Sequence, residues 1–216
     1  MIMSKVTAAQ VFAASPIVPV MVIDDVKDAL PLAKALADGG ISVFEITLRT
    51  DAAIASIEAI SKEMPEAIVG AGTVINPEQY QAALDAGAQF VISPGFSPEL
   101  LEYSKTKEVP YIPGVATASE MITALSYDLD HLKFFPAEAN GGAPVLKAVS
   151  AALPQIKFCP TGGVKEANLA NYLALDCVGT VGGTWMIPQS AIQNKDWAQI
   201  TELSKKACAL VASLRG

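Results

Sequence analysis

The sequence predicts one α/β domain over residues 1–216, folded as a (β/α)8 TIM barrel with a helix at its N-terminus. Two observations predict this fold class. Short β-rich runs and amphipathic helical stretches alternate along the whole chain, which indicates a parallel sheet. Eight such runs fit into 216 residues, and this density favours a compact closed barrel over an open doubly wound sheet.

The expected strands are short runs rich in apolar and β-branched residues. They lie at residues 17–22, 43–47, 68–73, 90–93, 111–113, 132–135, 157–160 and 178–182. The expected helices lie at residues 25–38, 52–64, 77–86, 98–107, 119–125, 143–153 and 168–174, with a last helix at 197–214. Gly39-Gly40 and Gly87 end helices, while Asn76-Pro77 and Ser97-Pro98 place a capping side chain before a proline suited to the first helical turn.

The composition excludes several classes of protein. With 51% hydrophobic residues the chain can bury a large core, and a net charge of −7 gives no general attraction to nucleic acid or to anionic membranes. Three widely spaced cysteines, Cys159, Cys177 and Cys208, indicate reduced thiols in the cytoplasm rather than a disulfide framework. Polar residues and prolines interrupt the apolar run at 6–23, so we expect neither a signal peptide nor a membrane span.

Lys133 is a candidate nucleophile because it lies in an apolar strand that ends in a glycine-rich turn. Desolvation disfavours the ammonium form, so a buried lysine can present the neutral amine that a Schiff base requires. Alternatively, its stem crosses apolar surface and its head reaches water. Lys157 is a rival, since residues 157–160 repeat the Lys-Phe-x-Pro spacing of residues 133–136.

Glu45, Thr47 and Arg49 alternate along one expected strand and therefore share one face. In a barrel this face lines the lumen and its mouth, where active sites form. The planar guanidinium of Arg49 suits a carboxylate ligand because it can donate two parallel hydrogen bonds. The alternative is a structural ion pair between Glu45 and Arg49.

Other strand ends carry small residues and glycine pairs. Residues 70–72 would leave room beside Thr73, and Ser93-Pro94-Gly95 would form a loop at the same mouth. An ordinary turn is the alternative for both of these segments. Gly162-Gly163 and Gly182-Gly183 end neighbouring strands, where backbone N–H groups can approach a phosphate; close helix packing against the strand ends is the alternative. The three cysteines show no metal-ligand spacing and His131 is the only histidine, so we expect no metal.

These segments together resemble the class I 2-keto-3-deoxy-6-phosphogluconate (KDPG) aldolases, which often also split 4-hydroxy-2-oxoglutarate. The resemblance covers nearly the whole chain and rests on residues 43–50, 69–74, 92–95, 133–142 and 159–163. It implies a metal-independent and cofactor-free lyase, a phosphorylated keto-acid substrate and a homotrimer. The sequence departs from the family pattern at Thr184, where that pattern has serine.

The resemblance also implies a role for each candidate residue. Lys133 would form the Schiff base and Glu45 would transfer protons. Arg49 and Thr73 would hold the substrate carboxylate. Pro94, Phe135 and Thr161 would line the pocket, and the phosphate would lie near Gly162, Gly163, Gly183 and Thr184. A phosphate-binding barrel isomerase or synthase, or a non-catalytic phosphosugar-binding protein, would share the glycine-rich strand ends.

Overall fold

Residues 6–215 of the chain are described by a computed structural model in which helices and strands alternate. The strands are β1 (Ile17–Met21), β2 (Val43–Thr47), β3 (Ile68–Gly72), β4 (Phe90–Ile92), β5 (Tyr111–Ile112), β6 (Gly114–Val115), β7 (His131–Phe134), β8 (Lys157–Pro160) and β9 (Val181–Gly183). The helices are α1 (Ala8–Ala14), α2 (Val26–Asp38), α3 (Ala53–Glu63), α4 (Pro77–Asp85), α5 (Pro98–Lys105), α6 (Ala118–Leu125), α7 (Gly142–Ala152), α8 (Glu166–Leu173), α9 (Gln189–Gln193) and α10 (Trp197–Arg215). The alternation expected from the sequence is therefore present, and α9 is an addition.

All strand pairs are parallel, but the strands form two sheets rather than one ladder of eight. The first sheet has the order β5-β4-β3-β2-β1-β9, and the second has the order β6-β7-β8. Pro113 causes one break in the expected fifth strand: it has no N–H to donate, while its carbonyl accepts from the Lys133 amide at 3.0 Å. At the other side, isolated parallel bridges join Phe158 of β8 to Val178, and Thr161 after β8 to Gly182 of β9.

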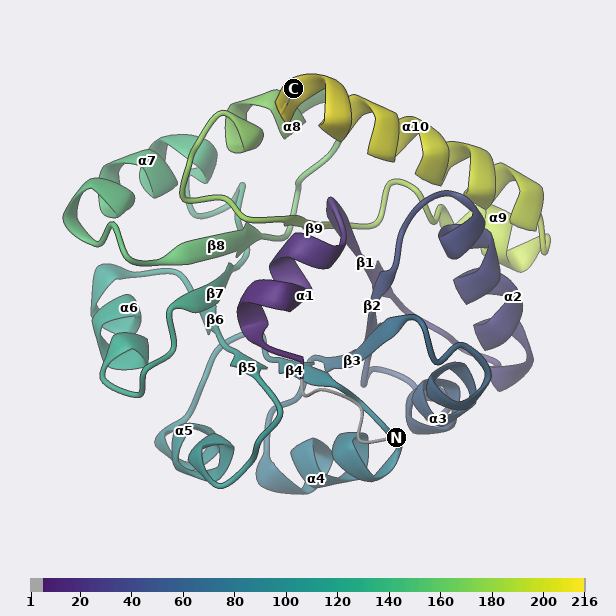
Figure 1. Cartoon of the computed structure of the whole chain (residues 1–216), viewed down its shortest axis with the longest axis horizontal. Helices are drawn as coiled ribbons and strands as arrows, with labels where there is room; N and C mark the ends of the chain where they lie inside the picture. The colour runs from purple at the N-terminus through teal and green to yellow at the C-terminus, as the bar shows by residue number, and fades with distance from the viewer. Residues whose placement is uncertain (1–5, 216) are drawn as a thin grey trace.

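Helix α1 covers the end of the molecule at which the strands begin. Figure 1 shows α1 across the centre of the strands, with the other helices arranged around them. Val11 and Phe12 of α1 are buried, and they pack against a cluster of apolar side chains between the sheets. That cluster comprises Val18, Val43, Phe90, Ile92, Ile112 and Cys159. Apolar side chains thus fill the half of the interior next to α1 and leave the end where the strands finish for a site.

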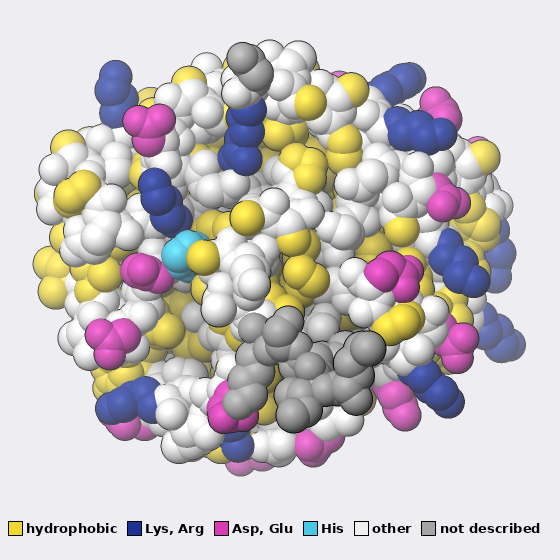
Figure 2. All heavy atoms as spheres, viewed as in Figure 1, with side chains coloured by type: hydrophobic (Ala, Val, Ile, Leu, Met, Phe, Trp, Pro, Cys, Tyr) yellow, Lys and Arg dark blue, Asp and Glu magenta, His cyan; other side chains and the backbone are white. Residues whose placement is uncertain are grey.

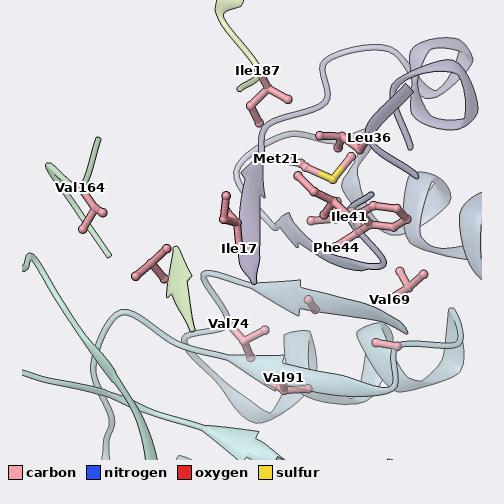
Figure 3. Close-up of a cluster of buried hydrophobic side chains, with 14 of the residues drawn as sticks. Ile17, Met21, Leu36, Ile41, Phe44, Val69, Val74, Val91, Val164 and Ile187 are labelled. Atoms are coloured by element: carbon pink, nitrogen blue, oxygen red, sulfur yellow. The ribbon is translucent and has the colours of Figure 1, made fainter. Parts of the chain in front are cut away.

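A larger apolar core lies between the strands and the outer helices. Leu36 of α2 and Ile41 gather beside Met21 of β1 and Phe44 of β2 (Figure 3), and all four side chains are almost fully buried. Side chains alternate along a strand, so Phe44 faces the helices while Val43 and Glu45 face the interior. This core fixes which residues of β2 can contribute to a site.

The outer surface shown in Figure 2 carries Lys and Arg side chains interspersed with Asp and Glu, with hydrophobic side chains between them. Within residues 6–215, no helix combines the length and the apolar character needed to cross a membrane.

Candidate active site

Lys133 and Glu45 meet in the interior of the molecule. The Nζ atom of Lys133 donates to Oε1 of Glu45 at 2.9 Å, and the two side chains are 6% and 1% exposed. The second carboxylate oxygen, Oε2, is buried and has no hydrogen-bond partner among the described residues. An amine, a carboxylate and a free acceptor therefore lie together in a site that excludes most water.

Glycine residues make room for this pair. A Cβ atom added at Gly72 of β3 would lie 2.2 Å from Glu45 Oε1, so the carboxylate occupies the space that a side chain would fill. Lower on the same face, the ring of Phe90 fills the corresponding space at Gly70. The small residues of β3 thus let Glu45 reach Lys133 across the interior.

The strand register separates the two candidate lysines. Lys133 pairs with Cys159 of β8, while Lys157 pairs with His131 at the beginning of β7. Lys157 Nζ donates to the carbonyl of Asp176 at 2.9 Å. Lys157 consequently lies toward the α1 end of the strands, two residues below the level of Lys133.

Cys159 lies next to this site but is a poor nucleophile. Burial, and secondarily the charge of Glu45, raise the pKa of the Cys159 thiol to about 12. The thiol therefore stays protonated near neutral pH, and the thiolate is the reactive form of cysteine.

Arg49 and Thr73 lie at the neighbouring ends of β2 and β3. Arg49 Nε donates to the Thr73 hydroxyl at 3.4 Å, and the Arg49 side chain is otherwise exposed. Thr47 uses its hydroxyl within the sheet, where it donates to the Met21 carbonyl at 2.8 Å. Among the described residues, Glu45 forms its ion pair with Lys133 and not with Arg49. The alternative of a structural ion pair between Glu45 and Arg49 is therefore wrong.

Pro94, Phe135 and Thr161 follow the ends of β4, β7 and β8. The Phe135 ring centroid is 5.4 Å from Lys133 Nζ. The Pro94 carbonyl fills the space beside Gly114, which is the strand partner of Lys133. The Thr161 hydroxyl lies where a Cβ atom of Gly182 would be, 2.1 Å from that position.

The glycine pairs after β8 and in β9 also serve packing. Gly162 and Gly163 have φ values of 98° and 81°, which glycine adopts without the strain of other residues. A Cβ atom at Gly183 would lie 1.9 Å from the Trp185 ring, so this glycine accommodates the indole. Thr184 is exposed and borders a cavity of about 250 Å³ that Val20 and Ile187 also line.

Glu138 and Tyr172 are two residues near these loops that the sequence does not single out. Glu138 packs on Gly163, and its Oε1 accepts a hydrogen bond from the Tyr172 hydroxyl. Glu138 lies in the segment that follows Lys133, but Tyr172 is on α8 and reads as an ordinary aromatic residue of an amphipathic helix. Only the packing of α8 brings the two together.

Comparison with known proteins shows the family of this chain. The sequence model of the family "KDPG and KHG aldolase" matches residues 8–203. The KHG/KDPG aldolase of Escherichia coli (strain K12) is 47% identical over 203 residues, which cover 94% of this chain and 95% of that protein. The chain belongs to the KDPG and KHG aldolase family. It is therefore an aldolase, a carbon–carbon lyase.

Two solved structures resemble the aldolase closely. One is the KDPG aldolase of Legionella pneumophila with pyruvate captured as a covalent carbinolamine; it is 50% identical, has a TM-score of 0.93 and is matched over 95% of this chain and 100% of that chain. The other is the KDPG aldolase of Zymomonas mobilis ZM4 with 3-phosphoglycerate, at 41% identity, a TM-score of 0.89 and coverage of 94% and 95%. The likeness of fold thus extends over nearly the whole aldolase chain.

Proposed function

We propose that the aldolase cleaves KDPG to pyruvate and glyceraldehyde 3-phosphate, and 4-hydroxy-2-oxoglutarate to pyruvate and glyoxylate, through a Schiff base on Lys133. The observation that carries this proposal is the buried contact of 2.9 Å between Lys133 Nζ and Glu45 Oε1. A carbinolamine is the adduct of an amine with a carbonyl, and the Legionella relative was captured with pyruvate in that form. Lys133 is the buried amine that can form it here.

The reaction begins when the amine of Lys133 attacks the C2 ketone and water leaves, which gives an iminium ion. Glu45, at hydrogen-bond distance, is a base that can take the ammonium proton before the attack. It returns that proton to the carbinolamine hydroxyl, which leaves as water. The carboxylate, ionised again, then accepts the proton of the C4 hydroxyl, directly or through a water, as the C3–C4 bond breaks. The bonding electrons move to the iminium and form an enamine, and the aldehyde leaves. Protonation of the enamine at C3 and hydrolysis release pyruvate and restore the amine.

The two ends of the substrate are held by different groups. Arg49 and Thr73 hold the keto-acid carboxylate, since they are adjacent at the strand ends and the guanidinium is exposed. Pro94, Phe135 and Thr161 line the pocket around the imine. The phosphate lies near Gly162, Gly163, Gly183 and Thr184, because among residues 6–215 the N–H groups of Gly162, Gly163 and Thr184 donate to no backbone carbonyl.

The direct test is to incubate the purified protein with KDPG and measure both products. Equal amounts of pyruvate and glyceraldehyde 3-phosphate are expected, and the rate should be unchanged after exhaustive chelation of metals. No turnover of either keto acid would favour a phosphosugar-binding protein. Release of an isomerised product without pyruvate would favour a phosphate-binding isomerase.

We also infer a closed eight-stranded barrel formed by a single domain. The isolated bridges from Phe158 to Val178 and from Thr161 to Gly182 support the closure on one side, and the bond of Lys133 to the Pro113 carbonyl, between β5 and β6, supports it on the other. Free thiols at Cys159, Cys177 and Cys208 support a cytoplasmic location.

For the assembly we propose a homotrimer, so sedimentation should give a mass near three times 22.5 kDa.

A further inference from the structure

We propose that Glu138 and Tyr172 set the preference of the aldolase between phosphorylated and unphosphorylated substrates. In this inference, Glu138 is a positioning residue that shapes the loop of Gly162 and Gly163 and places a fixed negative charge beside it. Tyr172 holds that charge in place. The inference rests on the proposed function, because it assigns the phosphate to this loop.

The backbone around Glu138 joins the Lys133 strand to the glycine loop. The Ala137 amide donates to the Thr161 carbonyl at 2.8 Å, and the Glu138 amide donates to the Gly162 carbonyl at 3.0 Å. These bonds link the segment after β7 to the segment after β8. A displacement of Glu138 is therefore transmitted to the backbone groups proposed to bind phosphate.

The Glu138 side chain occupies the space above two glycines. A Cβ atom at Gly163 would lie 2.6 Å from Glu138 Cγ, and one at Gly142 would lie 2.9 Å from Glu138 Oε1. Both glycines have positive φ values, 81° and 63°. The stem of Glu138 thus packs on Gly163, and its carboxylate oxygen Oε1 lies beside Gly142.

Tyr172 fixes the orientation of the carboxylate. Tyr172 is only 1% exposed, and its hydroxyl donates to Glu138 Oε1. Burial, and then the hydrogen bond and charge of Glu138, raise the pKa of the Tyr172 phenol, so the hydroxyl remains a donor throughout the neutral range. Asn168 of α8 holds the same loop from the other side, where its Nδ2 donates to the Gly163 carbonyl at 3.0 Å.

A carboxylate beside a phosphate repels it, and the hydrogen bond from Tyr172 weakens that repulsion by drawing charge toward α8. The charge of Glu138 should therefore lower the affinity for a phosphorylated substrate, and loss of the Tyr172 hydroxyl should lower it further. 4-Hydroxy-2-oxoglutarate has no phosphate, and its second carboxylate, at C5, ends short of the phosphate that KDPG carries on C6. Its turnover should be insensitive to both changes.

The experiment compares Glu138→Gln and Tyr172→Phe with the unmodified protein on both substrates. Glu138→Gln keeps the size and the acceptor for Tyr172. Because Glu138 is exposed, we expect KM for KDPG to fall only about twofold to fivefold, the range of an exposed charge interaction. For Tyr172→Phe we expect KM for KDPG to rise by a similar factor. In both variants kcat, and both constants for 4-hydroxy-2-oxoglutarate, should stay within twofold. Raising the salt from about 0.1 M to about 1 M should shrink both effects, because the Debye length falls from about 10 to about 3 Å.

A double variant and a binding measurement complete the test. If the charge is the cause, Tyr172→Phe should have little further effect in the Glu138→Gln background. The Kd of 3-phosphoglycerate, measured by calorimetry, should follow the same order without any turnover. Equal changes on both substrates, or weaker 3-phosphoglycerate binding by Glu138→Gln, would overturn the inference. Absence of turnover in the unmodified protein, with the expected order of Kd, would instead overturn the proposed function alone.

Discussion

The Nζ atom of Lys133 lies 2.9 Å from Oε1 of Glu45, although 88 residues separate them in the chain. Removing two charges from water is costly, and buried charged groups cluster at functional sites. Because Oε2 of Glu45 has no partner among the described residues, one acceptor remains for a substrate hydroxyl or a water. The pair can therefore hold a reactant without losing its own contact.

Borohydride reduction in the presence of pyruvate should attach a pyruvate-derived mass to Lys133, because only a Schiff base gives an irreversible adduct. Lys133→Arg should abolish the adduct and the activity. Lys157→Arg is the matched control and should retain both, since Lys157 bonds to the Asp176 carbonyl at the other end of the strand. Peptide mass analysis that located the adduct on Lys157 would refute the assignment.

Glu45→Gln should still form the trapped adduct, but more slowly because the carboxylate that takes the Lys133 proton is gone, and should lose about two to four orders of magnitude in kcat, the usual contribution of general acid–base catalysis. The amide keeps the size of the carboxylate and removes its ability to accept a proton. Trapping and turnover measured on the same preparation separate imine formation from proton transfer. Turnover close to that of the unmodified protein would make Glu45 a structural partner of Lys133.

Gly72→Ala should reduce kcat strongly in a folded protein. The added methyl group would lie 2.2 Å from Glu45 Oε1 and must displace the carboxylate from Lys133. Circular dichroism and the thermal midpoint would establish that the variant is folded. If a folded Gly72→Ala protein kept full activity, the position of Glu45 against β3 would not matter for the reaction.

Arg49→Ala should raise KM for KDPG and for 4-hydroxy-2-oxoglutarate alike, because both present the same carboxylate beside the imine carbon. Charge-assisted hydrogen bonds contribute about 1.5–3 kcal/mol each, so roughly tenfold or more is expected. Arg49→Lys should recover part of the loss, since it restores the charge but not the planar fork. An effect confined to the phosphorylated substrate would move Arg49 to the phosphate end.

Thr184→Val should lower kcat/KM for KDPG selectively. Valine keeps the shape of threonine and removes the hydroxyl beside the cavity of about 250 Å³. Thr184→Ser is the control and should retain the activity, because it keeps the hydroxyl. The ratio of kcat/KM for the two substrates is the measurement, and an unchanged ratio in Thr184→Val would place the phosphate elsewhere. This variant is a cleaner probe than a substitution at Gly163, where any side chain would also collide with Glu138.

The order of the elements could be predicted because alternation, caps and helix-ending glycines are local properties of a sequence. Asn76 and Ser97, for example, do cap α4 and α5, each followed by a proline in the first turn. The division into two sheets was not predictable from those patterns. The division arises because β5, before Pro113, pairs with β4, while β6, after Pro113, pairs with β7. Which strand each segment pairs with is a property of the assembled fold.

The candidate site shows the same limit. Period-two alternation along β2 predicts that Glu45 faces the interior, yet it does not show that Glu45 meets Lys133 rather than Arg49. The repeated Lys-Phe-x-Pro spacing leaves Lys133 and Lys157 equivalent until the register of β7 and β8 is known. A glycine pair likewise does not reveal whether it faces a ligand or, as at Gly183, an indole ring.

Helix α1 gives the interior a closed floor. Val11 and Phe12 close the interior at the end where the strands begin, together with the apolar cluster that includes Cys159. The Lys133 amine and the Glu45 carboxylate therefore exchange protons with bulk water through the opposite mouth. A substrate that fills this mouth therefore also shuts the route by which protons exchange with solvent. In the proposed mechanism, the proton that Glu45 removes would then stay in the site and be returned to the enamine before the product departs.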